Sequence, residues 1–114
     1  MRLFVAMIST AFILAMAGPV AAEKEEGMSG LHSKVRTGGK LCFLDHSHSG
    51  NSAGERSRRA AETAAIRSWQ DFTAWEYGRA WGSYSLAAGK SMQCSGSGNS
   101  WGCSIEARPC RGGR

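Results

Sequence analysis

Three potential metal ligands lie within the four residues Asp45-His46-Ser47-His48. Carboxylate and imidazole groups this close together can gather a copper or zinc ion on a loop or strand. No further ligand pair at a suitable spacing completes the set, and the surrounding segment is rich in Ser and Gly, which is typical of a solvated loop. A periplasmic copper- or zinc-binding protein is therefore the alternative hypothesis for function, and no resident cofactor is predicted.

The sequence offers little for catalysis. Asp45 and His46 with Ser47 or Ser49 have the residue types of a catalytic triad, but neighbours in sequence rarely converge in space, and no G-x-S-x-G motif is present. Two carboxylates for glycoside hydrolysis would have to come from Asp71 and Glu76, whose spacing of five places them on different faces of a helix. Nucleotide-binding motifs such as G-x-G-x-x-G are missing. The sequence therefore predicts a non-catalytic protein, with a secreted hydrolase as a third hypothesis.

The four cysteines are an even number in a small chain, which predicts two disulfide bonds if the chain is exported. A domain of this size buries little apolar surface, and each bridge typically adds ~2–4 kcal/mol of stability. Four cysteines allow three pairings. A turn at residues 97–100 favours Cys94–Cys103, which then face each other across a hairpin, and leaves Cys42–Cys110. A zinc site is not favoured, because there is no C-x-x-C pair.

The N-terminal segment has the features of a secretory signal peptide. Arg2 precedes an apolar run, Gly18 and Pro19 interrupt it, and small residues lead to Ala22. We predict cleavage after Ala22, and hence a periplasmic or secreted protein without membrane contact. An uncleaved anchor is the alternative, because residues 3–22 have about the length of a bilayer-spanning helix.

The remaining chain has room for one small domain, since the whole sequence has 114 residues. Residues 23–40 are rich in Glu and Gly and are predicted to be a flexible arm. Residues 41–111 form the predicted disulfide-stabilised domain, in which 41–44 is a short buried strand and 45–54 a loop. Residues 112–114 are a basic tail.

A long amphipathic helix is predicted over Glu55 to Tyr77, with Gly78 as its stop. Ser52 and Glu55 have the spacing of a capping box, and Ser57 is an alternative cap. The predicted buried face repeats at spacings of four, four and three residues. Its members are Ala61, Ala65, Trp69 and Phe72, widened by Ile66 and Thr73.

Beyond Arg79 the apolar period shifts toward two, which predicts a strand from Tyr84 to Cys94, although a short helix over 81–88 fits as well. Turn residues at 96–99 and renewed alternation over 101–107 predict an antiparallel hairpin. The predicted fold class is therefore α+β, with one long helix packed on a disulfide-bonded β-hairpin.

Several motifs together resemble a known group of proteins. They are Ser68-Trp69-Gln70-Asp71-Phe72, Tyr77-Gly78, Trp81, Lys90, Cys94, Trp101, Cys103 and Ala107-Arg108-Pro109-Cys110, preceded by the loop Asp45 to Gly50. This set is similar to small exported proteins of rhizobia and related alphaproteobacteria. That group has no assigned activity, so the resemblance implies a compartment and a fold, and no catalytic residue is carried over.

Aromatic and basic residues supply the candidate ligand surface. Most large rings are expected in the core, but Trp75 falls about 120° from Trp69 on a helix, and an exposed Trp75 or Trp81 beside an arginine can stack on a sugar. The chain carries 14 Lys and Arg against 9 Asp and Glu. Part of this excess clusters at Arg56, Arg58 and Arg59.

Together these features predict a small exported module that binds an anionic or carbohydrate ligand. Export makes an anionic polysaccharide or another envelope component a more suitable partner than nucleic acid. The oligomeric state is left open.

Overall fold

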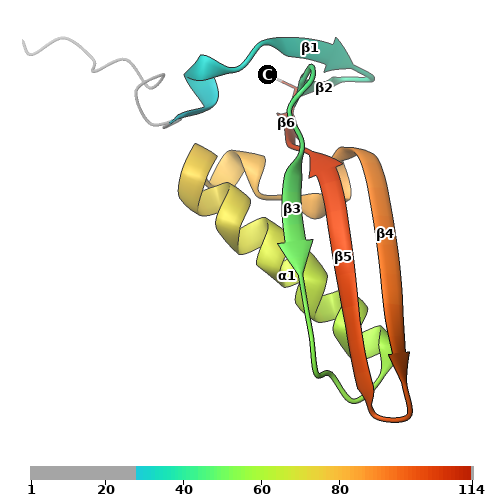
Figure 1. The fold of residues 1–114 in the computed structure, drawn as a ribbon. Coiled ribbons are helices and arrows are strands. Elements are labelled where there is room, and N and C mark those ends of the chain that lie inside the picture. Colours follow the sequence, from blue (N-terminus) through green and yellow to red (C-terminus); the bar gives the residue numbers. More distant parts are fainter. Residues whose placement is uncertain (1–27, 114) are drawn as a thin grey trace, which may run out of the picture.

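The computed structural model describes residues 28–113 and has the predicted α+β class. One long helix accompanies two antiparallel three-stranded sheets (Figure 1). The first sheet has the order β1 (Lys34–Thr37), β2 (Lys40–Phe43) and β6 (Cys110–Gly112). The second has the order β3 (His48–Asn51), β5 (Ser100–Arg108) and β4 (Ala88–Ser97). The predicted signal peptide and the first residues of the predicted arm lie outside the described residues.

Helix α1 spans Arg58–Tyr77 and begins later than predicted. The Ser57 side chain accepts a hydrogen bond from the backbone N–H of Ala60 at 3.1 Å, so Ser57 is the N-cap. The capping box at Ser52 was wrong because the Ser52 hydroxyl donates instead to the carbonyl oxygen of Ala61 at 2.6 Å. At the other end, Gly78 has φ of 102°, and its backbone N–H donates to Ala74.

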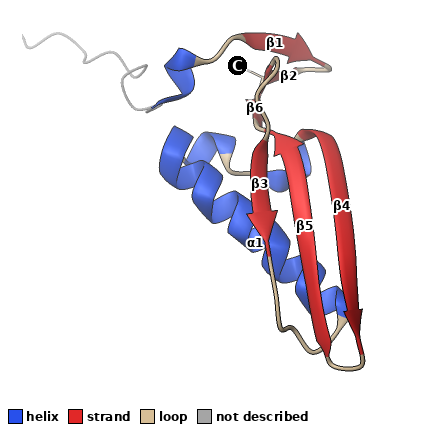
Figure 2. Ribbon diagram, in the orientation of Figure 1, coloured by secondary structure: helices blue, strands red, loops and turns tan. Residues whose placement is uncertain are grey.

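One side of α1 covers one face of the sheet β3-β5-β4 (Figure 2). Every fourth residue of this side is buried, and the set is Ala61, Ala65, Trp69, Thr73 and Tyr77. Phe72 was wrongly placed on the buried face and is 50% exposed, because the buried row continues through Thr73. Gly50 on β3 permits the close approach, since a Cβ there would stand 2.6 Å from that of Trp69.

The hairpin of β4 and β5 forms as predicted. Gly98 has φ of 57° at the first position of its two-residue turn, a conformation that glycine adopts without steric cost. Cys94 lies opposite Cys103 and is bonded to it, and Cys42 on β2 lies opposite Cys110 on β6 and is bonded to it. Both favoured disulfide pairings are therefore confirmed.

The chain passes from one sheet to the other at Pro109, a buried residue between β5 and β6. The carbonyl oxygen of Pro109 accepts a hydrogen bond from Phe43 at 2.9 Å, which ties β2 to this crossing. Phe43, Tyr77 and Trp81 form a second small core here, beyond the core between α1 and the larger sheet.

Several segments differ from the predictions. Residues 34–37, expected in a flexible arm, form β1 and pair with β2. Residues 48–51, expected in a loop, form β3, whose backbone pairs with β5 although its sequence has no apolar alternation. The strand predicted from Tyr84 begins only at Ala88, because residues 79–81 and 84–86 form two short 3-10 helices, in partial agreement with the alternative of a short helix over 81–88. Strand β6 also includes Gly112, the first residue of the predicted tail.

Candidate functional site

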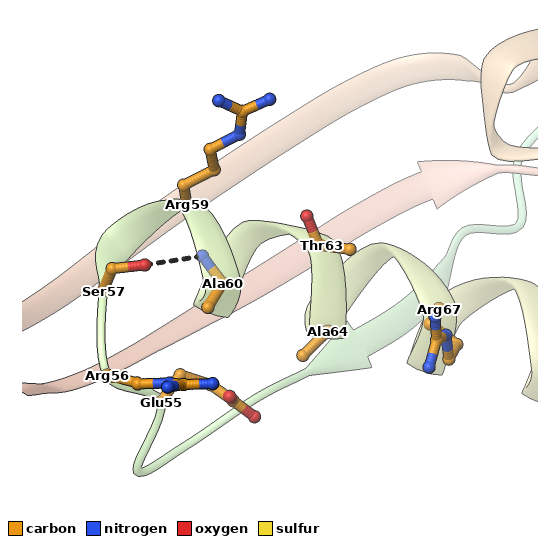
Figure 3. A pocket seen from close by; sticks show the side chains of 8 residues that line it. All are labelled: Glu55, Arg56, Ser57, Arg59, Ala60, Thr63, Ala64 and Arg67. Atoms are coloured by element: carbon orange, nitrogen blue, oxygen red, sulfur yellow. Dashed lines mark hydrogen bonds between the residues drawn. The ribbon is translucent and has the colours of Figure 1, made fainter.

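An open hollow lies at the N-terminal half of α1 and has a volume of about 560 Å³. Its lining comes from the loop before the helix and from the first three turns, and comprises Glu55, Arg56, Ser57, Arg59, Ala60, Thr63, Ala64 and Arg67 (Figure 3). Three of these residues are arginines and one is a glutamate. The hollow therefore carries a positive charge excess.

The three arginines are spread over the loop before α1 and the first part of the helix, and they do not converge on one point. In Figure 3, Arg56 lies beside Glu55, Arg59 extends from another side of the first turn, and Arg67 lies further along α1. Arg59 and Arg67 are separated by eight helical residues, or ~12 Å at 1.5 Å per residue. This spacing suits an extended ligand with several negative groups better than a single small ion.

No salt bridge within residues 28–113 occupies Arg56, Arg59 or Arg67, and all three are exposed. Arg58, also predicted to be part of the surface, does not line the hollow and pairs with Glu62 at 3.3 Å along the helix. The first turn of α1 contains no acidic residue, so its positive dipole end adds to the arginine charge. Electrostatics at this end of the helix favour an anion.

Trp75 lies on α1 outside the hollow and is 80% exposed. Its ring stacks on that of Phe72, with centroids 6.1 Å apart and planes 12° from parallel. Phe72 in turn lies 4.6 Å from the imidazole of His48. The prediction that Trp75 lies outside the main buried face is confirmed, and the sequence did not reveal that Phe72 joins it.

Trp81 is fully buried, so its prediction as a ligand surface was wrong. The 3-10 turn at Arg79–Trp81 directs its ring into the second core, where it lies 4.8 Å from Phe43. The guanidinium of Arg111 and the ammonium of Lys34 lie 5.5 and 5.7 Å from the same ring, in cation–π geometry. Trp81 stabilises the fold and is not available to a ligand.

The predicted metal ligands do not assemble. His48 is buried, its Nε2 lies 2.6 Å from the Glu76 carboxylate, and its Nδ1 lies 3.2 Å from the Thr73 hydroxyl. Both of its nitrogens therefore have protein partners. Asp45 is exposed, and no group of three or more His, Cys, Asp or Glu in the described part of the chain is arranged to hold a metal ion.

His46 instead belongs to a stack of rings. Its imidazole lies 4.3 Å from that of His32, nearly parallel to it, and His32 lies 5.0 Å from Phe43. Burial lowers the pKa of His32, and the neighbouring His46 lowers it further. The segment before β1 is thus packed against the second core through His32.

Arg67 was not among the arginines that the sequence analysis selected for the ligand surface. The signal that identifies its role is the spacing of four residues that links Arg59, Thr63 and Arg67 on one helix side.

No helix within residues 28–113 is long and apolar enough to cross a membrane.

Comparison of the chain with protein-family models, with curated proteins and with solved structures found no match. The similarity to small exported proteins of rhizobia stays a prediction.

Proposed function

We propose that the protein is a small, exported, non-catalytic module that binds an extended anionic ligand through α1. The single observation that supports this most strongly is the exposed trio Arg56, Arg59 and Arg67, which lines one hollow without any salt bridge to a described residue. Guanidinium groups bind carboxylate, sulfate and phosphate through paired N–H donors, so free arginines on one surface suit a ligand that presents such groups repeatedly.

The disulfides support the compartment in this proposal. Both bonds join residues that face each other across strand pairs, and no free cysteine is present among residues 28–113. Structural disulfides of this kind persist in oxidising compartments. The proposed route is a signal peptide over residues 1–22, which leaves the protein in the periplasm or outside the cell.

Binding at such a surface is weak for each contact and depends on salt. An exposed ion pair contributes about 0.2–1 kcal/mol, so two arginines account for roughly a two- to thirtyfold change in affinity. Screening over a Debye length of about 8 Å at physiological ionic strength reduces this contribution as salt rises. Affinity for a polyanion should therefore fall steeply with added NaCl.

The test compares two variants that lose the same charge. Arg59→Ala/Arg67→Ala removes two cations of the hollow, and Arg36→Ala/Arg79→Ala removes two exposed cations elsewhere. We expect elution from heparin at clearly lower salt for the first variant and close to wild type for the second. Equal shifts for both variants would mean that only net charge matters, and no retention of the wild type at low salt would refute the proposed function.

A further inference from the structure

The exposed side of α1 continues from the arginine-lined hollow to Trp75, whose ring stacks on that of Phe72. Every fourth residue on this side is exposed, and the row, here called the outer ridge, consists of Arg59, Thr63, Arg67, Asp71 and Trp75. It is offset by two residues from the buried row that begins at Ala61, which places it on nearly the opposite side of the helix. The outer ridge runs for ~24 Å along α1.

The chemistry of the outer ridge changes along its length. Its N-terminal half carries Arg59 and Arg67, which attract negative groups. Its C-terminal half carries Asp71, an exposed carboxylate with no salt bridge in the described region, and Trp75, whose ring stacks with Phe72. A purely anionic ligand would be repelled at Asp71. A carboxylate beside an exposed aromatic ring instead suits hydroxyl groups that donate hydrogen bonds.

A sugar ring has the properties that this C-terminal half requires. One face of a pyranose is lined by C–H groups and packs on an aromatic ring, while the hydroxyl groups at its edge donate hydrogen bonds to a carboxylate. Trp75 is 80% exposed, so its ring is accessible without any rearrangement of the fold. Phe72 holds it from one side at a centroid distance of 6.1 Å.

We propose that the outer ridge is a binding platform for an acidic polysaccharide, in which one sugar ring stacks on Trp75 while carboxylate groups further along the same chain pair with Arg67 and Arg59. This inference rests on the proposed function and specifies its ligand class. The separation of Arg67 and Trp75, eight residues or ~12 Å, allows one oligosaccharide to reach both. Nucleic acid is disfavoured because its phosphate at every nucleotide would meet Asp71.

The experiment measures binding of the full chain to four probes at one ionic strength. The probes are a hyaluronan decasaccharide, in which uronate alternates with a neutral sugar, polyglutamate of matched charge, neutral dextran, and a single-stranded DNA oligomer. Trp75→Ala tests the aromatic contact. Leu31→Ala is the matched control, because Leu31 is 76% exposed and lies outside the helix.

We expect hyaluronan to bind most tightly, with affinity about fivefold lower in Trp75→Ala, the scale of one exposed aromatic contact. Polyglutamate affinity should change less than twofold in Trp75→Ala, and Leu31→Ala should behave as wild type toward all probes. Circular dichroism should show that both variants retain the fold.

The two proposals fail in different ways. If polyglutamate and hyaluronan bind equally and Trp75→Ala affects neither, the ligand class is wrong and the anionic site stands. Tighter binding of DNA than of hyaluronan also overturns the ligand class. Loss of hyaluronan binding in Trp75→Ala with no effect of Arg59→Ala/Arg67→Ala would refute the anionic site itself.

Discussion

The two disulfides should contribute unequally to stability, because they close loops of very different length. Cys42 and Cys110 are 68 residues apart in sequence, whereas Cys94 and Cys103 are 9 apart. Loop-closure entropy at 25 °C assigns about 4.4 kcal/mol to the longer loop and about 2.6 kcal/mol to the shorter one. The variant Cys42→Ala/Cys110→Ala should therefore lose roughly 1.8 kcal/mol more than Cys94→Ala/Cys103→Ala.

The burial of the cysteines also predicts a greater loss of stability when the Cys42–Cys110 bond is removed. Cys42 and Cys110 are both fully buried, whereas Cys94 is only partly buried, so the first variant also loses more packing. Urea unfolding with linear extrapolation measures both free energies of unfolding. In thermal unfolding the 1.8 kcal/mol difference corresponds to roughly 7–14 °C in Tm.

If Cys42→Ala/Cys110→Ala is unfolded even without urea while Cys94→Ala/Cys103→Ala stays folded, the result agrees with this reasoning. Equal losses, or a greater loss in Cys94→Ala/Cys103→Ala, would refute it.

Three further predictions concern the packing of the helix and the histidines. Gly50→Ala places a Cβ 2.5 Å from the Ala65 carbonyl oxygen, so urea unfolding should show a loss of about 1–3 kcal/mol, and a neutral effect would contradict the close approach of β3 to α1. Glu76→Ala leaves the buried Nε2 of His48 without its carboxylate partner, and the free energy of unfolding should fall by about 1–3 kcal/mol, whereas an unchanged midpoint would argue against this contact. Burial and the neighbouring His46 lower the pKa of His32 in the folded state. The contribution of His32 to the free energy of unfolding is therefore fully present above the unfolded pKa of 6.5, and it is lost as pH falls from 6.5 through the folded pKa. His32→Ala should flatten the fall in stability below pH 6.5, and an identical pH profile would exclude this cause.

The helix and the disulfides were predictable because their signals are local. The repeat that includes Ala61, Ala65 and Trp69 specifies one helix face, and a two-residue turn places Cys94 opposite Cys103. The C-terminal part of the helix was harder, because Phe72 and Thr73 are neighbours and only the packing against β3 decides which of them is buried.

The strands at the N-terminal side were missed for a different reason. Strand β3 consists of His, Ser, Gly and Asn, residues whose sequence gives no strand signal, and it forms because β5 offers backbone partners. Strand β1 did have a signal: Gly38 and Gly39 form a two-residue turn between β1 and β2. Their composition suggested flexibility, but they adopt the positive φ values that a tight hairpin requires.

The candidate site was predicted only in part. Arg56, Arg59 and Trp75 could be selected because charge clustering and helical angle are sequence properties. The burial of Trp81 depends on a 3-10 turn, and the burial of His48 depends on contacts with Thr73 and Glu76 that are 25 and 28 residues away. Such contacts cannot be derived from local spacing.

The most direct measurement of the central claim is a two-dimensional ¹H–¹⁵N NMR titration of the disulfide-bonded protein with the hyaluronan decasaccharide. Binding through α1 predicts amide shift changes concentrated at residues 56–75, with the indole N–H of Trp75 among the largest. Shift changes confined to the outer strand β4, or none at a concentration where the oligosaccharide is retained, would contradict a ligand surface on α1.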